Sequence, residues 1–189
     1  MKSDVTHETV WLGRGGQGAF TAARLLGLSA VRFNSQHALA FPSFGPERRW
    51  APVFAYTRIC AAPIADRSPV FQASAFVVLD ESLLDQVATP FVHATTLLVV
   101  NSSVSSVTGQ VHRIEARRIA HEFLGSEHIN TILLGYLIGV TGLLPTATVE
   151  AAIQADFGPG TRAQKNILAC RHAVGLGKAA QVLQHIALT

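Results

Sequence analysis

The chain has 189 residues, a net charge of +3, 49% apolar residues and 14% charged residues. A typical charged fraction is about 25%, so this composition excludes an intrinsically disordered protein. The length suits one domain, and we expect residues 1–189 to form a single one. Two interpretations of the low charge remain open: neighbouring subunits cover part of the surface, or small apolar residues and a buried sheet account for it.

The first elements form a strand, a glycine turn and a helix. Residues 9–12 are predicted to be a buried strand, and residues 17–30 have the apolar spacing of a helix. The helical positions expected to face a sheet are Phe20, Ala23, Leu26 and Leu28. Periodicity fades over residues 37–52, where three prolines and a glycine predict a long structured loop.

The rest of the chain is predicted to contain strands and a short helix, followed by a helical C-terminal third. Strands are predicted at residues 53–59, 75–79 and 97–100, and a short helix capped by Asp80 or Ser82 at residues 81–87. Four helices are predicted to follow: 115–124, a helix capped by Asn130 and ending near Gly142, 149–157 begun by Thr146 or Thr148, and 161–186. The pattern predicts one Rossmann-like α/β domain with a mainly parallel sheet flanked by helices and a helical C-terminal third.

The sequence predicts neither a membrane protein nor a metal site on this chain. Apolar runs such as 132–140 are shorter than the ~20 residues that span a bilayer, and the polar start has no signal-type stretch, so we expect a cytoplasmic protein. Cys60 and Cys170 are too few to hold an iron–sulfur cluster alone, and we expect both to pack in the core. His121 and His128 lack the spacing of a zinc site.

The segment between a strand and a helix reads Gly13-Arg14-Gly15-Gly16-Gln17-Gly18 and fits the pattern G-x-G-x-x-G. Such a loop lets the backbone approach a ligand, and the helix N-terminus offers free N–H groups to a phosphate. A nicotinamide site also needs an acidic residue ~20 positions later, but residues 33–40 contain none, and Arg32 is a weak substitute. A free-standing dinucleotide-binding protein is therefore the alternative function, and glycines that only pack the helix are the structural alternative.

Positive charge gathers in the first third of the chain. Between Arg14 and Arg67 there are seven arginines and two acidic residues, a larger surplus than the net charge of the whole chain. No nucleic-acid-binding motif accompanies them, so an anionic ligand or an acidic partner surface explains them better than nucleic acid. Arginines on solvated faces remain the alternative.

Residues 41–49 read Phe-Pro-Ser-Phe-Gly-Pro-Glu-Arg-Arg, followed by Ala-Pro-Val at 51–53 and Thr-Arg-Ile at 57–59. With the glycine loop, these motifs resemble the gamma subunit of the 2-oxoacid:ferredoxin oxidoreductases, of which the pyruvate and 2-oxoisovalerate enzymes are the best known. Asn130, Leu134-Gly135 and residues 142–144 resemble the same family's C-terminal half. Trp50 stands where the family has a glycine. That difference has two interpretations: an altered substrate such as an aromatic 2-oxoacid, or packing at a subunit contact.

The resemblance implies a chain that is inactive alone. Thiamine diphosphate with magnesium would lie in alpha and beta subunits, and [4Fe-4S] clusters in a delta-type subunit. The complex would convert a 2-oxoacid to an acyl-coenzyme A and reduce ferredoxin or another acceptor. The gamma subunit would help to close the active site and contact coenzyme A. We expect no catalytic residue here, and the coenzyme A contacts are expected at Gly13, Arg14, Gly15, Gly16, Gln17, Gly18, Arg48 and Arg49, because arginines and free N–H groups suit its phosphates.

Overall fold

The computed structural model describes residues 6–43, 51–68, 70–84 and 92–186. The strands are β1 (His7–Arg14), β2 (His37–Pro42), β3 (Pro52–Cys60), β4 (Ala75–Val78), β5 (Leu97–Asn101), β6 (Ser106–Thr108) and β7 (Val111–Ile114). The helices are α1 (Ala19–Phe33), the 3-10 turn η1 (Glu81–Leu83), α3 (Ala116–Leu124), α4 (Asn130–Thr141), α5 (Thr146–Phe157) and α6 (Thr161–Ile186). No helix among these residues is long and apolar enough to cross a membrane.

The strands form one sheet in the order β2-β3-β1-β4-β5-β7-β6. β1, β4, β5 and β7 pair in parallel, whereas β3 is antiparallel to both β1 and β2, and β6 is antiparallel to β7. β3 and β6 therefore run against the other five strands. The predicted α/β class with a mainly parallel sheet is confirmed.

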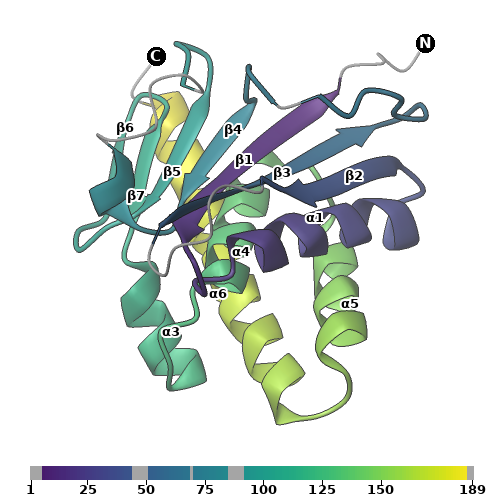
Figure 1. The fold of residues 1–189 in the computed structure, drawn as a ribbon. Helices are drawn as coiled ribbons and strands as arrows, with labels where there is room; N and C mark the ends of the chain where they lie inside the picture. The colour runs from purple at the N-terminus through teal and green to yellow at the C-terminus, as the bar shows by residue number, and fades with distance from the viewer. Residues whose placement is uncertain (1–5, 44–50, 69, 85–91, 187–189) are drawn as a thin grey trace.

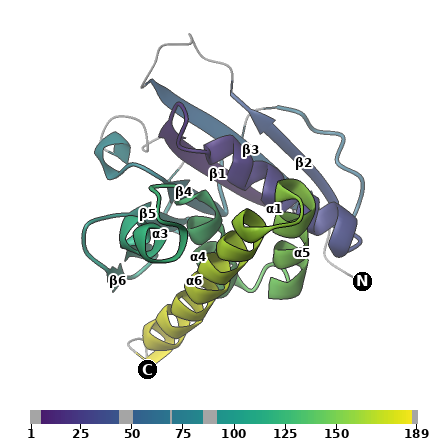
Figure 2. The same cartoon turned by 90° about the horizontal axis from the view of Figure 1, so that it is seen from below.

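The helices α1 and α3–α6 lie on one side of the sheet (Figures 1 and 2). α1 packs directly on β1, β2 and β3, whereas α3 and α5 pack chiefly on other helices. Because strand side chains alternate between faces, Trp11, Val77 and Val99 pack with these helices in the larger core cluster. Their neighbours, such as Leu12, Phe76 and Val100, form a second cluster on the opposite face. Among the described residues, that second cluster includes none from α1 or α3–α6 and is covered by Val70, Ala73 and Leu83.

The helices α4 and α6 cross with their backbones in contact. α4 is buried along almost its whole length, and three glycines make the crossing possible. A Cβ at Gly135 or Gly139 would lie 2.3 Å from a backbone oxygen of α6, and one at Gly177 would lie 2.5 Å from the carbonyl oxygen of Tyr136. Cys170 is fully buried at this crossing, and burial raises the pKa of its thiol to about 12.

Most predicted elements are present, but residues 37–42 are a strand and not part of a loop. In β2, Ala38 and Ala40 leave room for α1, since a Cβ at Gly27 would lie 3.4 Å from the Cβ of Ala40. Alanine has little preference for strands, so the pattern did not reveal β2. The short strands β6 and β7 were also missed.

Three smaller predictions need correction or stay open. Phe20 is 38% exposed and does not face the sheet, although Ala23 and Leu26 are buried as predicted. Asn130 is the first residue of α4 and makes no N-cap, because its Oδ1 accepts from the adjacent Thr131 N–H. Asp80 does cap the predicted short helix through the N–H of Ser82, but that helix is described over Glu81–Leu83, and residues 85–87 lie outside the described residues.

Candidate functional site

The glycine loop connects β1 to α1 at the carboxyl end of the parallel strands, the edge where α/β sheets bind ligands. Gly13 and Gly18 are needed for packing: an added Cβ would lie 3.2 Å from the Cβ of Leu79 at the first position and 2.8 Å from Asn130 Nδ2 at the second. Gly16 and Gly18 have φ values of 91° and 86°, which side-chain-bearing residues rarely adopt. Gly15 and Gly16 are exposed, and no described atom lies within 4 Å of a Cβ added there. These two residues form the crest of the glycine loop, and no described side chain or backbone covers the position of a Cβ there.

Arg14 is bound to the turn that follows the neighbouring strand β4. Its Nε lies 2.8 Å from Asp80 Oδ2, and its Nη2 donates to Ser82 Oγ at 2.9 Å. Burial favours a raised pKa for Asp80, but the hydrogen bonds from Ser82 and Arg14 outweigh it and lower the pKa of this carboxyl. The Arg14 charge is thus balanced by a carboxylate at the edge of the site.

Gln17 closes the loop on itself. Its backbone N–H donates to the Arg14 carbonyl oxygen at 3.0 Å, and its Oε1 accepts from the Arg14 N–H at 2.7 Å. Its Nε2 lies 3.4 Å from Asp80 Oδ2. Residues 14 and 17 are therefore joined to each other and to the same carboxylate.

The other predicted arginines, Arg48 and Arg49, lie outside the described residues, as do Phe44 and Trp50. The described chain resumes at Ala51, whose carbonyl oxygen accepts a hydrogen bond from the Gly15 N–H at 3.4 Å. The chain that follows Trp50 therefore starts at the crest of the glycine loop.

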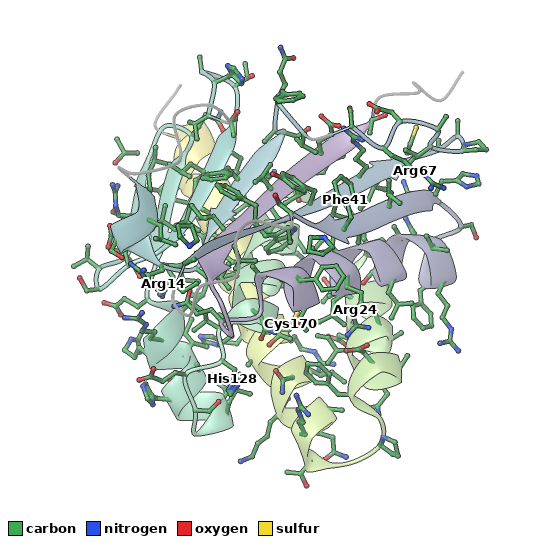
Figure 3. The ribbon with its side chains drawn as sticks, viewed as in Figure 1. Arg14, Arg24, Phe41, Arg67, His128 and Cys170 are labelled. Carbon is green, nitrogen blue, oxygen red and sulfur yellow. The ribbon has the colours of Figure 1, made fainter. Side chains whose placement is uncertain are left out.

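The structure disperses the other basic residues of the first third. Arg24 forms a bidentate ion pair with Asp156 of α5, and Arg58 is 3% exposed and pairs with Glu8 at 2.6 Å. Arg14 and Arg67 lie at opposite ends of the sheet (Figure 3). The arginines of this segment that the structure describes are therefore spread out, and Arg14, Arg24 and Arg58 are paired with carboxylates, so they do not form one anion-binding patch.

A cavity of about 570 Å³ borders the glycine loop on the helical side of the sheet. It is lined by residues at or near the N-termini of α1, α4 and α6, among them Gly18, Asn130 and Thr161. Arg162, Lys165 and His128 also line it, and none of the described lining residues is acidic. Helix N-termini carry partial positive charge, so this cavity favours an anion.

Arg162 and Lys165 were not predicted as site residues from the sequence. They belong to the first turns of α6, and the fold brings them to a loop that lies about 145 positions earlier in the sequence. The Arg162 guanidinium lies over the Phe157 ring, 4.7 Å from its centroid. Asn166 links α6 to α4, because its Oδ1 accepts from Thr131 Oγ1 at 2.8 Å. Within α6, its Nδ2 donates to the Arg162 carbonyl oxygen at 2.9 Å.

A second polar cavity, of about 510 Å³, lies at the carboxyl ends of β4 and β5. Its lining includes Arg117 and Arg118, but also the carboxylates of Asp80, Glu81 and Glu115. Arg118 pairs with Glu115 at 2.7 Å. The carboxylates make this cavity less favourable for a phosphate than the cavity beside the glycine loop.

Residues 8–176 match the family model described as pyruvate ferredoxin/flavodoxin oxidoreductase. The chain belongs to this family. It is 42% identical over 164 residues to pyruvate synthase subunit PorC from Methanothermobacter thermautotrophicus, covering 85% of this chain and 90% of that protein.

The same assignment follows from other members of the oxidoreductase family. The common gamma subunit of the pyruvate/ketoisovalerate oxidoreductases of Thermococcus kodakarensis is 38% identical over 171 residues, covering 85% of this chain and 91% of that one. The crystal structure of pyruvate oxidoreductase subunit PORC from Thermotoga maritima superposes with a TM-score of 0.78 at 29% identity, covering 90% and 96% of the two chains. The predicted gamma-subunit resemblance is confirmed, and it takes precedence over the free-standing dinucleotide-binding alternative.

The described residues contain no group of three His, Cys, Asp or Glu that could hold a metal ion. His121 lies 3.8 Å from Glu127, whereas His128 lines the cavity beside the glycine loop. Among the described residues, the lining of the cavity beside the glycine loop thus includes an imidazole and two cationic side chains.

Proposed function

We propose that this chain is the gamma subunit of a thiamine diphosphate-dependent complex that converts a 2-oxoacid to an acyl-coenzyme A. The alpha, beta and delta-type subunits would hold thiamine diphosphate, magnesium and [4Fe-4S] clusters, and ferredoxin or another acceptor would take the electrons. The gamma subunit would contribute no catalytic residue, have no activity alone, help to close the active site and work in the cytoplasm. Its family membership supports the type of complex. A pyruvate-like acid is the proposed substrate, with an aromatic 2-oxoacid as the alternative because of Trp50.

The cavity beside the glycine loop carries the proposal of a coenzyme A contact. Coenzyme A bears a 3′-phosphate and a diphosphate, and it needs cations and free N–H donors. The N-termini of three helices, Arg162 and Lys165 offer both around one cavity of about 570 Å³. We assign the phosphates to this cavity and to the exposed crest at Gly15 and Gly16, of which the Gly15 N–H already donates to the Ala51 carbonyl oxygen. Arg48 and Arg49 are proposed as further cations of the site, and Arg14 as the residue that holds the loop.

Kinetics of the assembled complex test this assignment. A hydrogen bond to a charged group contributes about 1.5–3 kcal/mol to the binding free energy. Arg162→Ala or Lys165→Ala, which would remove one such bond, is therefore expected to raise the Michaelis constant for coenzyme A roughly 10- to 100-fold. The Michaelis constant for the 2-oxoacid should stay nearly unchanged, because this cavity would not contact that substrate.

Lys178→Ala is the matched control, since Lys178 is an exposed cation on the same helix and does not line the cavity. Unchanged coenzyme A dependence in both cavity variants would refute the assignment. A loss of complex mass in the same variants would instead show that these cations hold a neighbouring subunit.

A further inference from the structure

Asp80 connects two neighbouring parallel strands at the edge of the site. The ladder between β1 and β4 continues past Val78, because the Leu79 N–H donates to the Leu12 carbonyl oxygen at 2.7 Å. Asp80 therefore follows β4 directly beside the start of the glycine loop. Its side chain is 14% exposed.

Both carboxylate oxygens of Asp80 are used as acceptors. Oδ1 accepts from the Ser82 N–H at 3.1 Å and from its hydroxyl at 2.6 Å. Oδ2 accepts from Arg14 Nε at 2.8 Å and from Gln17 Nε2 at 3.4 Å. An asparagine would keep the shape but present an NH₂ group to one of these donor pairs, so at least one side would lose its acceptor.

The two donors on Oδ2 come from the two ends of the crest. Arg14 precedes Gly15 and Gln17 follows Gly16, and Gly16 lines the cavity beside the loop. Asp80 is absent from the described lining of that cavity, so any effect of Asp80 on a ligand there passes through the loop.

We infer that Asp80 is a positioning residue for coenzyme A binding: through Arg14 and Gln17 it fixes the glycine crest against which the phosphates bind. This inference rests on the proposed function. It also gives Arg14 a role that differs from direct phosphate contact, because its charge is balanced by Asp80 and its guanidinium points along the sheet edge to Ser82.

The test compares Asp80→Asn with Glu81→Gln in the assembled complex. Glu81 is the next carboxylate along the chain and pairs with Arg113 at 3.3 Å, away from the glycine loop. For Asp80→Asn we expect faster amide hydrogen exchange over residues 15–18 and a Michaelis constant for coenzyme A raised about tenfold, with kcat at saturating coenzyme A unchanged. Glu81→Gln should change neither quantity.

A double-mutant cycle tests whether Asp80 affects coenzyme A binding through Arg14. If Asp80 acts through Arg14, then Asp80→Asn combined with Arg14→Ala should raise the coenzyme A Michaelis constant no more than the larger single change, whereas multiplied effects would show an independent Arg14–ligand contact and overturn the inference. Gln17→Ala removes the contact from Gln17 Nε2 to Asp80 and also the acceptor of the Arg14 N–H. It should therefore also raise the coenzyme A Michaelis constant, which provides a second test if Asp80→Asn fails to assemble.

The outcomes separate this inference from the proposed function. If Arg162→Ala raises the coenzyme A Michaelis constant and Asp80→Asn does not, the positioning role is wrong and the coenzyme A site stands. The positioning role is also wrong if Asp80→Asn speeds exchange over residues 15–18 without any kinetic effect. If neither variant changes coenzyme A dependence, both the site and the positioning role are wrong.

Discussion

Replacing Gly139 by alanine tests the packing that holds the helical layer together. The new Cβ would lie 2.3 Å from the Val174 carbonyl oxygen and 3.0 Å from Gly177 Cα, both backbone atoms that no side-chain rotation can move away. Non-bonded heavy atoms pack at about 3.5 Å, so α4 and α6 would have to separate by about 1 Å.

The expected free-energy change follows from two opposing effects. Overpacking a well-filled core costs about 1–3 kcal/mol, and here the separation would loosen contacts along the whole crossing. Alanine recovers up to about 1 kcal/mol because it favours the helix more than glycine does. We expect the free energy of unfolding to fall by about 2 kcal/mol, which corresponds to roughly 4–8 °C in Tm for a chain of this size.

Urea denaturation of the purified chain, followed by circular dichroism, measures this change, and Gly175→Ala is the matched control. Gly175 also lies on α6, but no described atom is within 4 Å of an added Cβ. Its replacement should therefore raise the free energy of unfolding by up to about 1 kcal/mol. The close crossing of α4 and α6 would be refuted if both variants changed the free energy of unfolding in the same direction, or if Gly139→Ala raised it.

Three further predictions concern other parts of the molecule. Gly18→Ala should destabilise the chain more than Gly16→Ala does, because both residues have positive φ but only Gly18 is crowded by Asn130. Equal decreases in the free energy of unfolding, measured by denaturant titration, would contradict this. Cys60 and Cys170 are buried, and burial raises the pKa of the Cys170 thiol to about 12. Iodoacetamide at pH 8 should therefore label neither thiol until the chain is unfolded, and a labelled cysteine in the mass spectrum of the native protein would contradict this. Burial lowers the pKa of His7 to about 4, and its Nε2 has no hydrogen-bond partner among the described residues, so protonation favours the unfolded chain. The free energy of unfolding should therefore fall as the pH drops from about 6.5 to 4, and His7→Gln should remove that part of the pH dependence; an unaltered pH profile in the variant would count against this reasoning.

The sequence predicted those elements whose patterns are long and local. The strand at β3 alternates, and those at β1, β4 and β5 are short apolar runs. The helices α1 and α3–α6 follow helical apolar spacing and end signals such as Gly125 and Gly142. β2 was missed because its alanines are selected by contact with α1, which is a tertiary constraint. β6 and β7 were missed because they are short and mix polar with apolar residues, whereas β4, equally short, is a continuous apolar run.

The candidate site was predicted in part for the same reason. The glycine loop is a local motif, and its place between β1 and α1 could be read directly from the sequence. The ion pair of Arg14 with Asp80 joins residues 66 positions apart, and Arg162 and Lys165 reach the loop through the packing of α6. Such contacts depend on tertiary structure, so one sequence does not reveal them.

The most direct test of the central claim is amide hydrogen exchange of the assembled complex with and without coenzyme A. We predict slower exchange on coenzyme A addition over residues 15–21, 128–131 and 161–166, which surround the cavity beside the glycine loop. The segment 105–109, which contains the edge strand β6 and does not line that cavity, should exchange at the same rate in both states. Protection that spares all three cavity segments while coenzyme A is bound would contradict a gamma subunit that holds the phosphates of coenzyme A.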